Sequence, residues 1–518
     1  MTDSLPSPAR VRTLVATFLA RRADRADRLA HYSASQGAYR GTSGLPGVAA
    51  PRRIMTREEA IALGQFVRET KNRPDADVQI LHKATAVAMR YPDSAPRCLD
   101  VDAFQLSWQE TFGVIAENKY VWITTDVRDI ETLRHVLQHA IRPAPESIDP
   151  DEIEERATWD KIYQPHTYTY LPSKLWHSTT AAAVDTQRGA MLARLLDPLA
   201  GTEWRGAGTV AASEIGFCVF TGAMKNIHWD EATDSEISLT VRSADGTATG
   251  WSGHAHRDWN QLAPERVARE AIAVAKQQLH PTRAEPGRYT AILSATAVGQ
   301  FLQQMAGSFN VAAASPFSVR GVPLGGRDRR GQRVFDPRIT LVTDPSDPEG
   351  GDFPFFPDGL AYPSGKATWV EQGVLKQRSV SVSNGLTLGM TPLRNPDCVR
   401  MTGGPTSVEE MIAQCERGMY VHRFSSLSSA DLWSGTMDGF TRGGCLLIMN
   451  GKIKGPVKDF RFYESPFLAF NRVLALGTPQ RVAFGFTPRV ATAWPYSPVI
   501  APPMMVRDFN FSALADNA

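Results

Sequence analysis

The sequence predicts an α+β protein, with an N-terminal helix-and-sheet domain followed by a C-terminal domain dominated by antiparallel β-sheet. Three observations support this fold class. The chain has 518 residues, 42% of them hydrophobic, which is too long for a typical single core. Its first half alternates between helical and strand-like periodicity, whereas its second half is rich in hairpin signals. We expect an N-terminal α/β region over residues 1–285 and a C-terminal domain over 286–518.

The N-terminal region is expected to begin with helices and then alternate with strands. Apolar residues recur at helical spacing over 8–31, 56–70, 126–141, 180–199 and from Pro264 to just before Pro281. Strand-like runs cover 78–123 and 209–252, and the Asp245-Gly246 pair predicts a hairpin. An Ala/Pro/Gly-rich break over 37–52 predicts a mobile connector, so that residues 1–52 form a helical lead-in.

The C-terminal region carries two short hairpin signals and one clear helix. The hairpins are expected at 370–375 and at 446–453, where Asn450-Gly451 favours a type I′ turn. The helix is expected over 407–416, opened by Thr406 or Ser407, with two glutamates in its first turn, and closed by Gly418.

Composition narrows the class of protein. Lysine plus arginine (56) nearly balances aspartate plus glutamate (54), so the formal charge of +2 provides no long-range attraction to nucleic acid or to an anionic membrane. Five widely spread cysteines without a CxxC pair fit a reduced chain. No apolar run approaches the roughly 18 residues that a membrane span needs. We expect a cytoplasmic protein that binds neither nucleic acid nor membrane.

Two groups of histidines could hold a metal ion. They are His135 and His139, four apart on a predicted helix, and a set on neighbouring strands made of His228, Asp230, His254 and His256. No glutamate follows His135 as in an HExxH motif, and exposed strand histidines are commoner than metal ligands. We interpret both groups as surface residues and keep the metal site as an alternative.

Other segments carry weaker signals. Arg327, Arg329, Arg330 and Arg333 could touch a phosphate or an acidic peptide, but we interpret them as a solvated loop without the aromatic residues of a nucleic-acid site. Residues 344–358 lack the spacing of a calcium loop and read as a proline-stiffened loop. Neither GxSxG nor GxxxxGK[ST] occurs, so serine hydrolases and nucleotide hydrolases are not predicted.

The C-terminal half also contains an ordered series of segments. These are 289–294 (YTAILS) leading into a helix, 336–344 (DPRITLVTD), 371–375 (EQGVL), 435–444 (GTMDGFTRGG) and 450–459 (NGKIKGPVKD). The series resembles the TldD/PmbA family, historically called modulators of DNA gyrase. The resemblance runs from about Gly206 to Phe511 and is weak before that.

The resemblance implies a zinc motif that this chain has lost. Active TldD-like members carry HExxxH on the helix after the first segment and a cysteine ligand near the C-terminus, which together hold zinc with one position open. Here the matching residues are Gln303, Gln304 and Ser308, and residues 484–506 contain no cysteine. Glutamine and serine are poor zinc ligands, and Gln304 has no carboxylate to act as a base. We expect no metal and no catalytic residue in this chain.

The pattern resembles the PmbA (TldE-like) side of the family. It implies a non-catalytic subunit, without a cofactor of its own, that pairs with a zinc-bearing TldD-like subunit, or with itself, to process small or unstructured peptides. If peptides add to a sheet edge, as the family implies, candidate cleft residues are Asp438, Phe440, Arg442 and Asn450, with core or turn roles as the alternative.

Two further hypotheses remain open at this point. The chain could be a metal-free enzyme that reuses the family cavity to tailor a peptide or natural product, in which case Gln303, Gln304 and Ser308 would contact the substrate. It could also be a peptidase whose replacement ligands come from the histidines named above.

Overall fold

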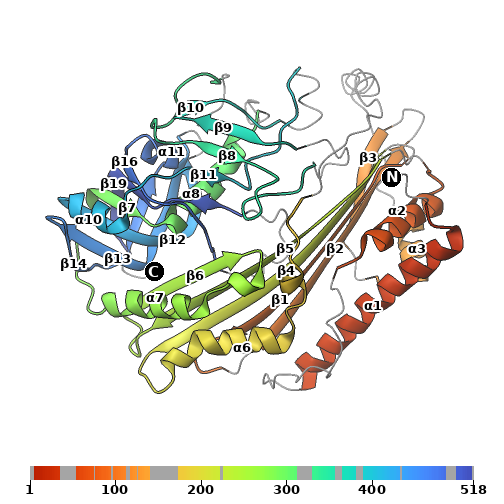
Figure 1. The fold of residues 1–518 in the computed structure, drawn as a ribbon, viewed down its shortest axis with the longest axis horizontal. Coiled ribbons are helices and arrows are strands. Elements are labelled where there is room, and N and C mark those ends of the chain that lie inside the picture. The colour runs from red at the N-terminus through yellow and green to blue at the C-terminus, as the bar shows by residue number, and fades with distance from the viewer. Residues whose placement is uncertain are drawn as a thin grey trace.

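A computed structural model describes residues 5–35, 54–74, 76–94, 97–112, 117–124, 127–139, 173–221, 226–311, 329–355, 364–380, 385, 389–431, 434–485 and 498–515. The expected mobile connector at 37–52 and Arg327 lie outside these ranges. The described residues form a mixed α+β structure: a large N-terminal sheet with helices on it, and a sheet-rich C-terminal domain (Figure 1). The predicted fold class is confirmed.

The N-terminal sheet is antiparallel and has the strand order β3-β2-β1-β4-β5-β6. Its strands are β1 (Val78–Arg90), β2 (Arg97–Phe112), β3 (Glu117–Thr124), β4 (Arg205–Thr221), β5 (Asn226–Arg242) and β6 (Thr249–His256). The predicted hairpin at Asp245-Gly246 is present, but its turn is longer than a two-residue turn, because the N–H of Ser243 already bonds to the carbonyl of Ala248.

Helices cover one face of this sheet. They are α1 (Pro8–Ser35), α2 (Arg57–Lys71), α3 (Ile130–His139), α5 (Ser178–Ala181), α6 (Asp185–Leu196), η1 (Asp197–Leu199), η2 (Trp259–Gln261) and α7 (Pro264–Gln277). On β4, Val210 and Ala212 pack under α6 and α7, and Cys218 and Phe220 pack under α1–α3. These alternate residues share one face of the strand, and the C-terminal domain lies on the opposite side (Figure 1).

The helix predicted over 180–199 is split. α5 ends at Ala181 and α6 begins at Asp185, because Val184 takes an extended conformation and acts as the N-cap of α6. The buried Thr180 explains the break, since its hydroxyl donates to the carbonyl of Arg257 at 2.6 Å and so ties the end of α5 to the chain after β6.

The C-terminal domain contains two sheets. The first has the order β12-β7-β19-β15-β13-β14, with β16 paired to β19, and the second has the order β10-β9-β8-β11-β18-β17. The strands are β7 (Gly287–Leu293), β8 (Leu341–Thr343), β9 (Ala367–Glu371), β10 (Val374–Leu375), β11 (Arg400–Met401), β12 (Arg417–Asp431), β13 (Thr436–Met449), β14 (Lys452–Pro456), β15 (Phe460–Glu464), β16 (Val473–Leu476), β17 (Gln480–Arg481), β18 (Ile500–Ala501) and β19 (Met504–Leu514). Antiparallel pairs dominate as expected, although β12 pairs with β7, and β11 with β18, in parallel.

One core holds these two sheets together around the helix α8 (Ala295–Met305). The helix begins at Ser294, whose hydroxyl accepts the N–H of Ala297, and it buries Val298, Phe301, Leu302 and Met305. Phe301 lies 4.7 Å from Phe424 of β12, measured between ring centroids, which is within the range of favourable aromatic pairs. The apolar face of α8 therefore fixes the helix in place independently of any metal.

The two predicted hairpins of this domain are confirmed. β9 and β10 join through Gln372 and Gly373, and β13 and β14 join through Asn450 and Gly451. All four turn residues have positive φ, as a type I′ turn requires.

The helix predicted over 407–416 is observed as α10 (Val408–Gln414), and a second short helix of this domain is α11 (Pro466–Ala469). Ser407 and Glu410 form a capping box at the start of α10. The predicted closure by Gly418 is wrong. The helix ends at Cys415 in an extended conformation, and Gly418 already lies in β12, where an added Cβ would come within 2.5 Å of the Thr290 carbonyl.

Candidate functional site

The motif positions lie at the C-terminal end of α8, on the side away from its core. Gln303 and Gln304 are exposed, and Ser308 is half-buried in the 3-10 helix η3 (Ala306–Phe309) that follows. Residues five apart on a regular α-helix point about 140° apart. The 3-10 turn winds more tightly, by about 120° per residue, and so carries Ser308 further round from Gln303. The winding of η3 therefore sets the direction of Ser308 relative to Gln303.

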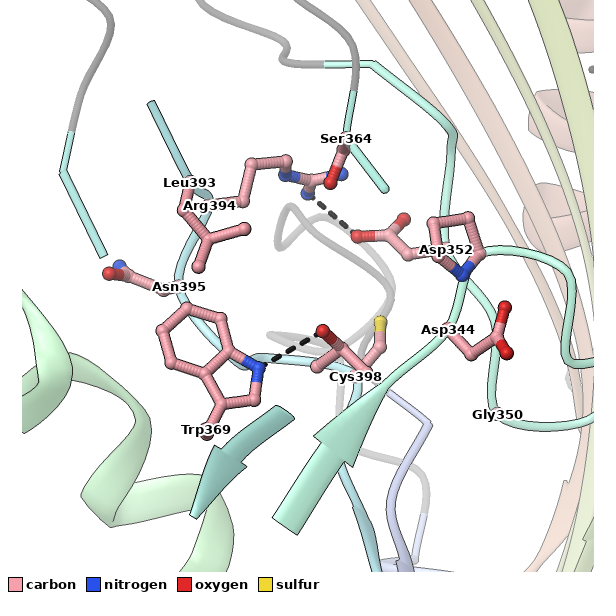
Figure 2. A pocket seen from close by; sticks show the side chains of 11 residues that line it. Asp344, Gly350, Asp352, Ser364, Trp369, Leu393, Arg394, Asn395 and Cys398 are labelled. Carbon is pink, nitrogen blue, oxygen red and sulfur yellow. Dashed lines mark hydrogen bonds and ion pairs between the residues drawn. The ribbon is translucent and has the colours of Figure 1, made fainter. Parts of the chain in front are cut away.

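A small pocket lies beside η3 (Figure 2). The Trp369 ring packs edge-on against Phe309 at 5.6 Å, and Asn395 bonds to the side chain of Asn310, so the pocket wall contacts the C-terminal end of the η3 segment. The cavity volume is about 20 Å³, room for about one water molecule. Its walls are held by an Asp352–Arg394 ion pair at 2.7 Å and by the Trp369 indole N–H, which donates to Thr343.

Cys398 also lines this pocket, but its environment makes it a poor nucleophile. The thiol is buried, and burial followed by the nearby Asp352 carboxylate raises its pKa well above the ordinary value, against the effect of Arg394. Because the thiolate is the reactive form, this residue is expected to be inert at neutral pH. The pocket therefore lacks an activated cysteine.

The loop between β8 and β9 connects this pocket with the N-terminal sheet. Each acidic side chain in the described part of this loop pairs with a cation, in the pairs Asp344–Lys366, Asp347–Arg400, Glu349–Arg481 and Asp352–Arg394. Further along the loop, Phe353 and Phe355 pack on Phe217 of β4. The loop is thus fixed between the two halves of the molecule by ion pairs and aromatic contacts.

A buried ionic network joins the two halves at the same place. Arg481 of β17 donates to Asp234 of β5 at 2.6 Å and to Glu349 at 2.5 Å. The side chains of Arg481 and Asp234 are only 7% and 5% exposed, so both charges depend on each other for solvation. Burial raises the pKa of Asp234 to about 6, even though Arg481 and Arg257 act to lower it.

Glu236, two residues further along β5, holds the chain that follows β17. Its carboxylate accepts the backbone N–H groups of Gly485 at 2.7 Å and Phe484 at 3.4 Å. Burial and the neighbouring Asp234 raise the pKa of Glu236 to about 7. This carboxyl group therefore titrates near neutral pH at the junction of the two halves.

The four candidate cleft residues are only partly brought together. Asp438, Phe440 and Arg442 alternate along β13 and so share one face, and all three are half-buried. Asp438 forms a two-bond ion pair with Arg461. Asn450 lies apart from them, in the β13–β14 turn. Of the four, Arg442 lines a cavity of about 450 Å³ between the two halves.

The histidine groups do not converge on one site. His135 and His139 stack on each other on the exposed face of α3, with ring centroids 4.0 Å apart. His228 is buried near one end of β5, whereas His254 pairs with Ile237, nine residues further along that strand. At about 3.3 Å per residue this separates the two by roughly 30 Å. Within the described ranges, no three His, Cys, Asp or Glu side chains form a group that could hold a metal ion.

The described residues of the basic cluster also lie at the surface. Arg329, Arg330 and Arg333 are exposed, and Arg333 donates to the carbonyl of Gln372 at 3.2 Å. No described helix is long and apolar enough to cross a membrane.

Sequence reasoning missed the ionic network. Arg481 and Asp234 are 247 positions apart, so nothing local connects them. One signal was available, because Asp234 and Glu236 are alternate residues within a predicted strand, and acids that are buried in a sheet need partners from elsewhere.

A comparison with protein-family models assigns the C-terminal domain to a metallopeptidase-like class. Residues 286–513 match the family model described as the PmbA/TldA metallopeptidase C-terminal domain. The C-terminal domain therefore matches the C-terminal domain of the TldD/PmbA family. A search of curated protein sequences finds no match.

Solved structures show that the fold extends over most of the chain. A protein from Bacteroides thetaiotaomicron described as a modulator of DNA gyrase is 16% identical and aligns with a TM-score of 0.69, covering 89% of this chain and all of the other. A Thermotoga maritima protein of the same description is 15% identical, with a TM-score of 0.67 and coverage of 88% and 100%. TldE from Thermococcus kodakarensis is 13% identical, with a TM-score of 0.64 and coverage of 86% and 99%.

Proposed function

We propose that this chain is a non-catalytic subunit of the TldD/PmbA family, which lacks its own zinc site and pairs with a zinc-bearing TldD-like subunit to process small or unstructured peptides. The observation that carries the proposal is which residues helix α8 keeps and which it has replaced. The helix keeps its full apolar face, while Gln303, Gln304 and Ser308 stand where an HExxxH motif would supply two imidazoles and a carboxylate.

The donors at these positions do not fit a zinc ion. A glutamine amide oxygen and a serine hydroxyl are weak ligands beside imidazole or thiolate. Cys398 is the cysteine among the described residues that line the adjoining pocket. Its thiol is buried, and because burial raises its pKa well above the ordinary value, it is protonated at neutral pH. We therefore expect no metal-dependent catalytic step in this chain.

The likeness to TldE supports the pairing. TldE of Thermococcus kodakarensis shares the fold at a TM-score of 0.64, and a fold that is kept without ligands suits a subunit whose role is to complete a shared assembly. The peptide substrate and the partner follow from the family resemblance. Zinc would then reside in the partner subunit.

The test is zinc analysis with size-exclusion chromatography, on the chain alone and after co-expression with a homologue that has an intact HExxxH motif. Zinc absent from the lone chain but present in a stable complex is the expected result. Stoichiometric zinc in the lone chain would overturn the proposal. A metal-free homodimer that does not bind the homologue would favour instead a metal-free enzyme that tailors a peptide or natural product.

Back-substitution provides a second, independent test. The triple variant Gln303→His, Gln304→Glu, Ser308→His restores the three motif residues but not the missing cysteine ligand. We expect less than about a tenth of an equivalent of zinc to remain after dialysis against a weak chelator. One equivalent of tightly bound zinc would show that the end of the helix still has the geometry of a zinc site and that only the ligand side chains were lost.

A further inference from the structure

A second cavity, far larger than the pocket of Figure 2, lies between the two halves of the molecule. Its volume is about 450 Å³, within the range of small-molecule sites. It is lined by the β5–β6 hairpin (Arg242, Gly246, Thr247, Thr249), the segment after α7 (Gln278, Pro281), the β13 bulge (Arg442, Gly443, Gly444), the segment between β14 and β15 (Val457, Lys458, Asp459) and Ala515. Residues from both halves therefore face one space.

The described lining carries an excess of positive charge. Arg242, Arg442 and Lys458 contribute three cations, against the single carboxylate of Asp459. The Asp459 carboxylate accepts a hydrogen bond from Thr441 at 2.9 Å. The nearest acid of the hairpin, Asp245, is exposed and is bound by its own turn, including the N–H of Thr247 at 3.1 Å.

A half-buried arginine next to the cavity adds to this excess. Arg423 of β12 stacks on the Trp251 ring at 4.7 Å, and its Nε atom is buried without a hydrogen-bond partner. Burial, followed by the nearby Arg442, lowers the pKa of Arg423 to about 10. Two guanidinium groups are thus held close together with Asp459 as their shared counter-charge. Such an arrangement is stabilised by an additional anion.

The backbone of the bulge suits the same ligand. In the β12–β13 register Val421 pairs with Cys445 and Arg423 with Arg442, so Gly443 and Gly444 have no partner in that ladder. Both glycines have positive φ and line the cavity without side chains. A ligand can therefore approach the peptide groups closely, next to the Arg442 guanidinium.

We propose that this cavity binds a small molecule that bears a carboxylate or phosphate group, held by Arg442 and Arg242 from opposite halves of the chain. The site is separate from the α8 motif and does not depend on the proposed function. A ligand that bridges the halves would stabilise the folded chain by RT ln(1 + [L]/Kd), where [L] is the free ligand concentration.

Isothermal titration calorimetry of the full chain tests the proposal, with sodium pyrophosphate as the phosphate probe and citrate as the carboxylate probe at constant ionic strength. We expect saturable binding of at least one probe, and the tighter one identifies the source of the oxyanion. No saturable heat from either probe at millimolar concentration would overturn the proposal.

Variants decide whether binding occurs in this cavity. Arg442→Gln and Arg242→Gln are expected to weaken binding about tenfold or more, because each removes a charged hydrogen-bond donor. Lys454→Gln is the matched control, since Lys454 is exposed on β14, carries the same charge and does not line the cavity. Asp459→Asn should tighten binding. Because Arg242 is exposed, its variant remains informative if Arg442→Gln fails to fold.

Two results would contradict the assignment. Unchanged affinity in both arginine variants would place the anion elsewhere. A loss in Lys454→Gln as large as that in Arg442→Gln would mean that the probes respond to overall surface charge rather than to this cavity.

Discussion

Replacing Arg481 by methionine removes the cation of the buried network while keeping an apolar side chain of similar length. Arg481 is 7% exposed and bridges Asp234 at 2.6 Å and Glu349 at 2.5 Å. The change leaves Asp234, itself 5% exposed, close to two other acids. The expected consequence is a large loss of stability at the junction between the N-terminal sheet and the C-terminal domain.

The magnitude follows from the buried carboxylate. Even with Arg481 present, the pKa of Asp234 is about 6 against an ordinary value of 3.8, and this shift corresponds to roughly 3 kcal/mol in favour of the protonated form. Removing one partner of a buried pair costs about 3–5 kcal/mol. We therefore expect Arg481→Met to lower the free energy of unfolding by about 3–5 kcal/mol at pH 8.

The pH dependence has a defined sign. Because the folded-state pKa of Asp234 is raised, the folded protein binds the proton more tightly than the unfolded chain does. The corresponding stability is fully present below about pH 3.8 and is lost as the pH rises through about 6. In the variant the folded pKa rises further, since Arg481 no longer lowers it. The loss caused by the substitution should therefore be smaller at pH 5 than at pH 8.

Urea unfolding followed by tryptophan fluorescence at pH 8 and pH 5 measures both effects. Arg194→Met is the matched control, because Arg194 pairs with Glu265 at the surface, with side chains 51% and 52% exposed, and such pairs contribute about 0–1 kcal/mol. The reasoning is refuted if Arg481→Met costs no more than the control at pH 8, or if its cost does not decrease at pH 5.

Three further predictions concern packing, capping and reactivity. Gly250→Ala should destabilise the fold by about 2–4 kcal/mol in urea unfolding, because its Cβ would meet α7 backbone atoms at 2.2–2.3 Å. The control Gly246→Ala lies in open space at φ +73° and should cost about 1 kcal/mol. Equal losses in the two variants would contradict this packing. Ser407→Ala should cost about 1 kcal/mol through the lost cap of α10, and no loss would argue against the capping box. Cys398 should resist iodoacetamide at pH 8 until urea unfolds the chain, and native-state labelling would show that it is accessible.

Local features of the fold were predicted well because they depend on neighbouring residues. Asn450-Gly451 sets its turn through backbone conformations that few other residues adopt, and Ser407 caps its helix through a residue three positions away. Where prediction failed, a distant contact had intervened. Gly418 was expected to end a helix, but pairing with Thr290 places it in a strand.

The candidate sites depended even more on distant contacts. Resemblance to a family located Gln303, Gln304 and Ser308 on one helix, but the 3-10 end of that helix, which carries Ser308, became visible only in the structure. Arg442 was singled out from the sequence, yet its neighbour Arg242 comes from the other half of the chain, 200 positions earlier.

The sequence by itself determined the α+β class and most helices and hairpins, because these are properties of residue identity and short-range spacing. The tertiary structure decided which charges meet. The Arg481–Asp234 pair and the cationic cavity exist only because the C-terminal domain lies on the face of the N-terminal sheet opposite its helices. Burial there gives ordinary side chains shifted pKa values, since desolvation and neighbouring charges act through space and leave no local pattern in the sequence.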